Sequence, residues 1–142
     1  MHYVTEILAQ KGRRVFAVHP RSSVLDAIRE MNHRSIGALL VIEEDELLGI
    51  VSERDYARRV ILKGRRSDNT LVEEIMSTEL ISTTAGATLD GCMELMTEHY
   101  IRHLPVLKAG KVTGVVSMGD LVKAIMIRQR STIEELTHYI KG

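Results

Sequence analysis

The sequence predicts an α+β fold in which two βαββα units pack as a pseudo-twofold pair, with a short helix before and after them. A pattern of residues recurs after 65 positions, which is the first sign of a repeat architecture. Within each copy the apolar spacing indicates a strand, a helix, two strands and a helix. A unit of about fifty residues buries too little surface to be stable alone, so the two units are expected to share an interface.

The clearest repeated stretch runs from Gly49 to Asp55 and again from Gly114 to Asp120. Each copy consists of glycine, two apolar residues, serine, two variable residues and aspartate. The aspartates lie 120 minus 55, or 65, positions apart. The same offset, without a gap, pairs further identical residues, namely Met31/Met96, Ile36/Ile101, Leu39/Leu104, Val41/Val106, Gly49/Gly114, Val51/Val116 and Ser52/Ser117.

The first half of the chain divides into elements at recognisable signals. His19-Pro20 ends a strand, because proline restricts its predecessor and cannot donate to a ladder. Ser23 is a helix N-cap with Asp26 three residues later. An almost wholly apolar run at 36–42 is typical of a strand covered on both faces. The expected elements are a short helix over 4–8, a loop over 9–14, strands over 15–18, 36–42 and 47–51, and helices over 24–33 and from Ser52 to near Gly64.

The second half repeats this order after a polar segment. Residues 64–69 are rich in turn formers and predict a linker, followed by a short helix over 70–76 that echoes residues 4–8. A capping box at Ser131–Glu134 predicts a separate last helix, which either packs back on the module or contributes to a dimer or partner contact. The expected organisation is a single module over 1–142, with repeats at 15–63 and 80–127, a linker with a short helix at 64–79 and a C-terminal helix at 128–142. The second repeat is expected to contain strands over 80–83, 101–107 and 112–116, a helix that Thr88 caps and a helix after Ser117.

Composition excludes several classes of function. Lysine plus arginine equals aspartate plus glutamate at 19 each, so no global field attracts nucleic acid or an anionic membrane. Aromatic residues make up 4% of the chain, too few for base-stacking platforms. One cysteine excludes a disulfide framework within the chain, and no apolar run approaches the roughly 20 residues of a membrane span. With no signal-peptide pattern at the N-terminus, a cytoplasmic protein is expected.

The repeats resemble the CBS domain, named after cystathionine β-synthase, and the tandem pair called a Bateman module. The resemblance covers residues 15–63 and 80–127, most of the chain. Three features carry it: Ser23-Val24 with Ala27 and Met31, matched by Thr88-Leu89 with Cys92 and Met96; Ile101–Val106 with its weaker partner Ile36–Val41; and the two seven-residue stretches.

The resemblance implies a regulatory role. CBS pairs typically bind adenosine-containing ligands (AMP, ADP, ATP, NAD(H) or S-adenosylmethionine) in clefts between the repeats and regulate an attached enzyme, channel or transporter. Because no other domain is recognisable in the sequence, it is similar to a stand-alone tandem pair. Such pairs commonly form disc-shaped homodimers, so a homodimer and an unidentified protein partner are expected.

The serine and aspartate of each stretch have two readings. Ser52 with Asp55, and Ser117 with Asp120, form a capping-box-like start to a helix. A carboxylate also accepts two hydrogen bonds from a ribose diol, and a hydroxyl with exposed N–H groups suits a phosphate. In CBS domains the matching aspartate typically holds the ribose and the matching serine or threonine lies near the phosphate. The two readings are compatible.

The resemblance adds other candidate ligand contacts, each with a structural alternative. Arg102-His103 matches basic residues that face nucleotide phosphates in the regulatory subunit of the AMP-activated kinase; the alternative is a surface arginine and a satisfied histidine. The first repeat has Gly37-Ala38 there, which predicts two unequal sites. The remaining positions match the adenine pocket or its backbone contacts and are equally consistent with plain core, namely Ile36, Ile50, Ile101, Val115, Phe16 and Ile81.

Other chemistry finds little support in the sequence. His99 and His103 are four apart but fall on either side of an expected helix end, so no metal site is assigned. Cys92 aligns with Ala27 on a buried helix face and is expected to be a core residue. There is no nucleophile–base pair and no glycine-rich nucleotide fingerprint, so an enzyme is not expected. The resemblance to CBS pairs thus favours an adenine-nucleotide sensor without an obligatory cofactor; the alternative is a protein-interaction scaffold with non-functional clefts.

Overall fold

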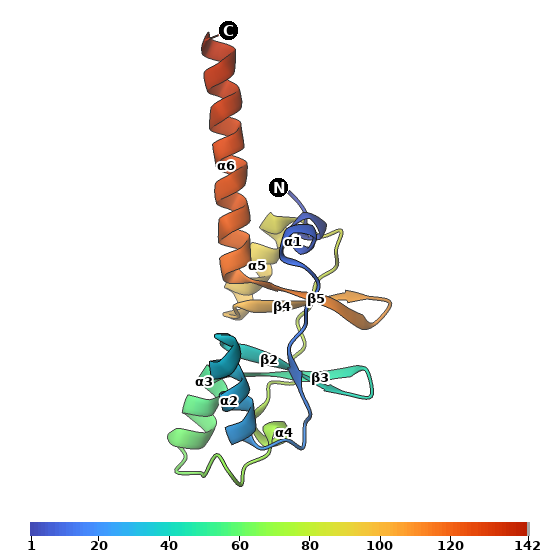
Figure 1. Ribbon diagram of the computed structural model, residues 1–142, viewed down its shortest axis with the longest axis vertical. Helices are drawn as coiled ribbons and strands as arrows, with labels where there is room; N and C mark the ends of the chain where they lie inside the picture. The colour runs from blue at the N-terminus through green and yellow to red at the C-terminus, as the bar shows by residue number, and fades with distance from the viewer. Residues whose placement is uncertain (142) are drawn as a thin grey trace. The chain divides into compact units, whose positions relative to one another are not determined.

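The computed structural model describes residues 1–141 and divides them into two compact α+β units (Figure 1). Unit 1 combines Met1–Arg14 with the chain from Ile81 onward, and unit 2 is Val15–Leu80. The predicted fold class, an α+β chain with two repeats, is confirmed. None of the helices within residues 1–141 combines the length and the apolar character needed to cross a membrane.

Unit 2 contains one three-stranded sheet with helices packed on it. Its elements are β1 (Ala17–Val18), α2 (Val24–Arg34), β2 (Ala38–Glu43), β3 (Glu46–Ser52), α3 (Glu53–Tyr56), the π-helical segment η1 (Ala57–Ile61) and α4 (Val72–Ile75). The strand order is β1-β2-β3, with β1 parallel and β3 antiparallel to β2. The buried face of α2, including Val24, Ala27 and Met31, packs with the strands into one core.

Unit 1 repeats this plan with a smaller sheet. Its elements are α1 (Val4–Lys11), α5 (Leu89–His99), β4 (His103–Lys108), β5 (Lys111–Ser117) and α6 (Met118–Lys141). The strand predicted over 80–83 is reduced to a single parallel bridge between Thr83 and Val106. The Thr83 N–H donates to the Pro105 carbonyl, and the Thr83 carbonyl accepts from Leu107, both at 2.9 Å. Thr83 thus uses both of its backbone groups in this bridge, and the pairing does not extend to a ladder of several residues.

The two units match in register as well as in order. Ala38 pairs with Ser52, and His103, 65 positions further on, pairs with Ser117. Each hairpin also has a register shift at the same place, after Val41 and after Val106. The N-caps predicted for α2 and α5 are confirmed, because the hydroxyls of Ser23 and Thr88 accept backbone N–H groups at 3.1 and 3.0 Å.

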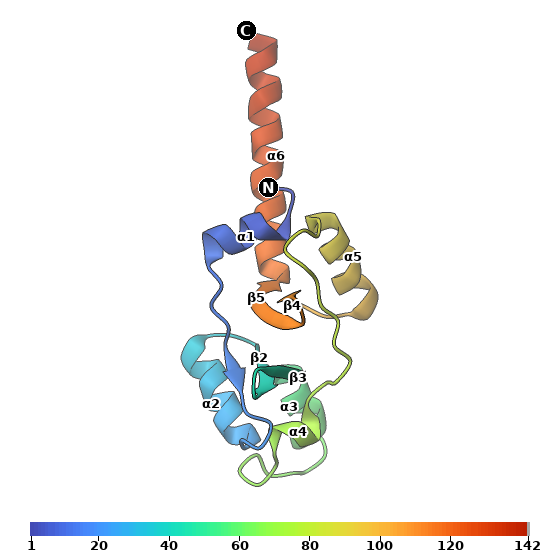
Figure 2. The same cartoon turned by 90° about the vertical axis from the view of Figure 1, so that its right-hand side faces the viewer.

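The short helices are exchanged between the repeats. Helix α1 precedes the first repeat in sequence but packs in unit 1, and α4 precedes the second repeat but packs in unit 2 (Figure 2). Equivalent backbone hydrogen bonds hold both helices. Val4 donates to Ala87 at 3.0 Å and Thr5 to Ala85 at 2.9 Å; Val72 donates to Ser22 and Glu73 to Pro20, both at 2.9 Å. The echo between residues 4–8 and 72–76 therefore has a structural cause.

The repeated glycines make room for these exchanged segments. A Cβ on Gly49 would lie 2.6 Å from the Ser77 carbonyl oxygen and 3.0 Å from the sulfur of Met76. A Cβ on Gly114 would lie 2.8 Å from a methyl group of Leu8 in α1. Each glycine is thus needed for a close approach, by backbone in unit 2 and by a side chain in unit 1.

The prediction of a separate C-terminal helix at 128–142 is wrong, because α6 runs without a break from Met118 to Lys141. Ser131 lies inside the helix and caps nothing, while Thr132 donates its hydroxyl proton to the Arg128 carbonyl at 3.0 Å. Helical hydrogen bonding already satisfies the N–H groups that a cap would serve. The expected loop over residues 9–14 also begins later, since α1 extends to Lys11.

We expect the two glycines to differ in their tolerance of alanine. Gly49→Ala should lower the free energy of unfolding by about 3 kcal/mol, because the obstacle is a hydrogen-bonded backbone carbonyl. Gly114→Ala should cost about 1 kcal/mol, because the end of the Leu8 side chain can move. Chemical denaturation measures both. Gly86→Ala, where nothing lies within 4 Å of the new Cβ, is the control; equal costs at all three positions would contradict the close-approach explanation.

Candidate ligand-binding sites at two helix starts

Each repeat ends its last strand in a serine that caps the following helix. In unit 2 the Ser52 hydroxyl accepts the Asp55 N–H at 3.2 Å, and Asp55 Oδ2 accepts the Ser52 N–H at 2.9 Å. Asp55 Oδ2 also accepts the Ser52 hydroxyl proton at 3.0 Å. The capping box predicted from the sequence is therefore present, and it fixes both side chains at the point where β3 becomes α3.

Unit 1 contains the same reciprocal pair. The Asp120 N–H donates to the Ser117 hydroxyl at 3.0 Å, and the Ser117 N–H donates to Asp120 Oδ2 at 2.8 Å. A further equivalent bond ties each helix start to the residue before the neighbouring strand: Met118 donates to the Arg102 carbonyl at 2.8 Å, as Glu53 does to the Gly37 carbonyl at 3.1 Å. The backbone frame is thus the same at both helix starts, and the side chains around it differ.

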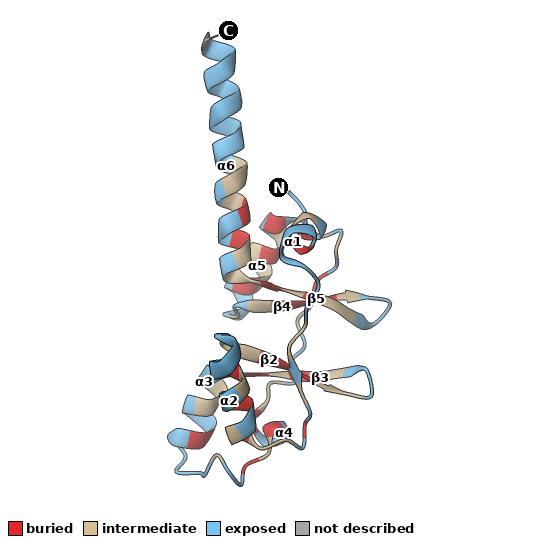
Figure 3. Cartoon of the chain, viewed as in Figure 1, coloured by how far each residue is buried: buried red, intermediate tan, exposed pale blue. Residues whose placement is uncertain are grey.

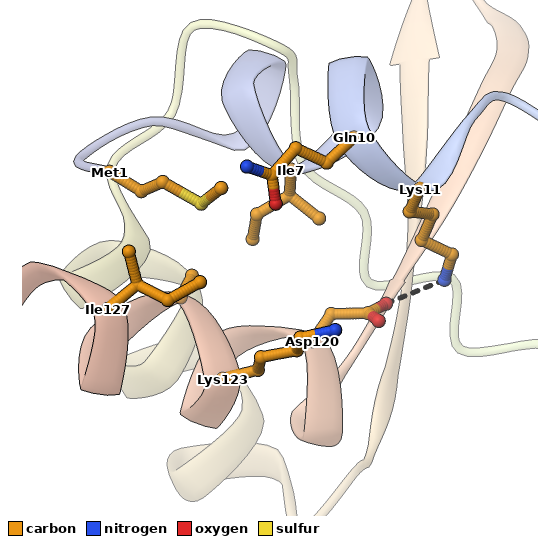
Figure 4. Close-up of a pocket in the computed structure, with 8 residues that line it drawn as sticks. Met1, Ile7, Gln10, Lys11, Asp120, Lys123 and Ile127 are labelled. Carbon is orange, nitrogen blue, oxygen red and sulfur yellow. Dashed lines mark hydrogen bonds and ion pairs between the residues drawn. The ribbon is translucent and has the colours of Figure 1, made fainter.

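Lys11, at the end of α1, marks the main difference. Its ammonium donates to Asp120 Oδ2 at 2.6 Å, joining two residues 109 positions apart (Figure 4). At the corresponding place after α4, 68 positions later, the chain has Glu79, which is exposed. Sequence reasoning missed Lys11 because nothing near it in the chain points to Asp120; only the exchange of α1 brings the two together.

The charge on Asp120 is stabilised by its neighbours. Partial burial is the largest single influence and acts to raise its pKa, but the hydrogen bonds from Lys11 and Ser117, together with the lysine charge, outweigh it. The pKa of Asp120 is therefore below its ordinary value, and the carboxylate is ionised at neutral pH. Its contribution to stability is present above the unfolded-state pKa and is lost as the pH falls through the lower, folded-state value.

His103 interacts with Lys11 and Asp120, and the same kind of pKa shift leaves it neutral whereas Asp120 is charged. Burial first, and then the positive charges of Lys11 and Arg102, lower its pKa below the usual 6.5, while Asp120 acts to raise it. The imidazole is neutral at pH 7 and serves as a hydrogen-bonding group rather than a fixed cation. A bound anion near it would favour its protonation.

A pocket of about 200 Å³ lies beside this cluster, between α1 and the start of α6 (Figure 4). The side chains that line it are Met1, Ile7, Gln10, Lys11, Asp120, Lys123, Ala124 and Ile127. Met1 and Ile127 lie at one end of the pocket and Lys11 and Asp120 at the other, with their ion pair drawn between them. Asp120 therefore faces both a helix N-terminus and an open volume.

The structure distributes the other predicted contacts between the units. Phe16, Ile36 and Ile50 belong to unit 2 with Ser52 and Asp55, while Ile81, Ile101, Arg102, His103 and Val115 belong to unit 1 with Ser117 and Asp120. Arg102 is exposed, and the apolar residues of both sets are half-buried. Phe16 and Ile36 pack against the core of unit 2, and Ile81 and Ile101 against that of unit 1. The half-burial of these apolar residues is consistent both with packing at the edge of the core and with lining a ligand pocket.

Two smaller expectations concern cysteine and metal. Cys92 is fully buried, 3.4 Å from the Thr83 hydroxyl, so its predicted place in the core is confirmed. Across residues 1–141, no group of three or more His, Cys, Asp or Glu side chains is arranged to hold a metal ion.

The chain is a tandem-repeat module, because the same order of strands and helices occurs twice. Each copy has a capped helix start and half-buried apolar residues near it. The CBS domain model matches residues 4–62 and 72–127, which is most of the chain. The chain therefore belongs to the CBS-domain family, as a CBS pair. Pairs of this kind are regulatory or signal-transduction modules.

Relatives agree with this assignment. The chain is 41% identical over 125 residues to the mitochondrial CBS domain-containing protein CBSX3 of Arabidopsis thaliana, covering 84% of this chain but 61% of that protein. A solved structure of a Burkholderia ambifaria protein with CBS domains is 45% identical, with a TM-score of 0.85 over 91% of this chain and 96% of that one. The CBS pair of protein MJ0100, solved with 5′-methylthioadenosine and S-adenosyl-L-methionine, shares the fold at 22% identity, with a TM-score of 0.78 over 89% of this chain and 97% of that one.

We expect the pKa of His103 to report on this cluster. In an NMR titration of the ring protons it should lie below 6.5 in the folded protein. Lys11→Met should raise it by removing a nearby positive charge, and Asp120→Asn should lower it by removing a negative one. His103→Gln identifies the resonance. A pKa at or above 6.5, or shifts of the opposite sign, would contradict the arrangement of charges described here.

Proposed function

We propose that the chain is a regulatory module that binds adenosine-containing ligands, such as AMP, ADP, ATP or NAD(H), and transmits their occupancy to a partner protein. The observation that carries this proposal is the ionised Asp120, held by Ser117 at a helix N-terminus and paired with Lys11. Its sequence and fold neighbours are CBS pairs, and the MJ0100 pair holds two adenosine derivatives. In keeping with the composition, we propose a cytoplasmic homodimer without nucleic acid or membrane as its partner.

Ligand recognition would follow from the groups already present. The described hydrogen bonds to the Asp120 carboxylate all end on Oδ2, which leaves Oδ1 to accept a ribose hydroxyl. The Ser117 hydroxyl, at the N-terminus of α6, suits a phosphate, and Arg102 supplies an exposed positive charge. Ile101 and Val115 would offer apolar contacts to the adenine.

Lys11 gives a route from binding to a response. A ribose that engages Asp120 competes with the 2.6 Å ion pair, and the released ammonium is then free to pair with a phosphate. Lys11 is the last residue of α1. When it pairs with the phosphate in place of Asp120, α1 loses its ion pair to the start of α6. The ligand would favour the arrangement it binds more tightly, and a partner would read that arrangement.

Asp120→Asn tests the ribose contact. The amide oxygen can still accept the Ser117 N–H, so the helix cap should remain, but the charge is lost. We expect binding of AMP, measured by calorimetry, to weaken about tenfold or more, as for loss of a charge-assisted hydrogen bond. Asp26→Asn, another first-turn aspartate, is the matched control. If wild-type protein binds none of AMP, ADP, ATP, NAD, NADH or S-adenosylmethionine at millimolar concentration, the proposal fails and the interaction-scaffold alternative is favoured.

Lys11→Met tests the exchange of partners. Adenosine carries no phosphate, so removing its competitor for Asp120 should leave adenosine affinity equal or higher. AMP should bind about tenfold less tightly, because its phosphate loses a charged partner. Calorimetry with both ligands on the same variant separates these effects. Equal weakening for adenosine and AMP would show that Lys11 acts only by holding α1 in place.

A further inference from the structure

The second half of α6 extends beyond the rest of unit 1. Arg128 joins α6 to α5 through Asp90, with hydrogen bonds of 3.2 and 3.5 Å. Every described side chain from Gln129 to Ile140 is exposed (Figure 3). Helical segments shorter than about 12–15 residues are marginal in water without packing, so this part of α6 needs a partner to be stable.

The exposed apolar residues of α6 form one continuous stripe. We call it the α6 stripe. Its positions are alternately four and three residues apart and are Val122, Met126, Gln129, Ile133, Leu136 and Ile140. This is the a/d spacing of a coiled-coil seam. Its five apolar members are between 46% and 82% exposed. Leu121 and Ala124, which α6 buries in unit 1, lie on another face, about 100° and 160° around the helix from the centre of the stripe.

Charge favours an antiparallel arrangement of two such helices. Lys123 and Arg130 make the exposed surface before the middle of α6 basic, since Arg128 is paired with Asp90, and Glu134 and Glu135 make the following turn acidic. A parallel pair would bring like charges together. An antiparallel pair places the acidic turn of each helix near the basic half of the other, and the same surface serves both copies, as a closed twofold contact requires.

We propose that the α6 stripe is the contact between two copies of this chain, packed as an antiparallel helix pair. Ile133 of one copy lies opposite Gln129 of the other, Leu136 opposite Met126, and Ile140 opposite Val122. The extended half of each helix thus covers the anchored half of its partner. Folding back onto its own unit would require α6 to break, and the helix is continuous from Met118 to Lys141.

Disulfide trapping tests the direction of packing. The double variant Met126→Cys/Leu136→Cys should form a covalent dimer under mild oxidation, seen on a non-reducing gel. Leu136→Cys alone should not, because antiparallel packing separates its two copies by ten residues, or about 15 Å, beyond the reach of a disulfide. The wild-type chain, whose only cysteine is buried, is the control. Trapping of the single variant, or no trapping of the double variant, would overturn the proposal.

Sedimentation equilibrium tests whether the stripe drives association. Ile133→Glu/Leu136→Glu should weaken self-association at least about tenfold, because it places charges in an apolar seam. Ser131→Glu/His138→Glu adds two carboxylates on the opposite side of the helix and should have little effect. Gln129→Leu should strengthen association by replacing the one polar residue in the stripe. Equal self-association of all these proteins, or weakening by the Ser131/His138 variant alone, would show that another surface or another protein covers the α6 stripe.

Discussion

The reciprocal hydrogen bonds between a strand-ending serine and the aspartate three residues later constrain the rest of each unit. In unit 1 they fix where β5 stops and in which direction α6 leaves the sheet. The same bonds hold the Asp120 carboxylate at the helix start, where Lys11 reaches it from α1. One short motif therefore sets the path of the longest helix, anchors the N-terminal helix and positions the principal group of the candidate site.

The repeats share a backbone but differ in charge. Register, bulges and helix-start bonds agree between the units, so the duplicated sequence conserves a frame. Lys11 pairs with the second aspartate, and Asp120, Lys11 and Arg102 all act on the pKa of the neighbouring His103, which lies below its usual value. The first helix start has Gly37-Ala38 and no lysine on Asp55. Two sites built on one frame can thus respond to different ligands or concentrations.

Most of the fold could be predicted because its determinants are local. Apolar periodicity, the caps at Ser23 and Thr88 and the 65-residue offset place nearly every element. Lys11 escaped prediction because its role depends on the exchange of α1, a long-range event without a local signal. The capping box at Ser131 was misleading because the preceding residues are good helix formers, so helical hydrogen bonds compete successfully with a side-chain cap. Ligand contacts at Ile50 or Val115 stay predictions, since half-burial serves two roles.

The exchange of α1 and α4 has a consequence for the order of folding. Unit 2 is one continuous stretch, Val15–Leu80, and all its partners are present once that stretch has left the ribosome. Unit 1 needs α1, which precedes unit 2 in the sequence, to meet strands and helices that follow unit 2 in the sequence. During synthesis the apolar face of α1 therefore stays exposed to solvent until the rest of unit 1 has been made. Loop closure for unit 1 costs less entropy after that, because a folded unit 2 leaves less flexible chain between the two parts of unit 1.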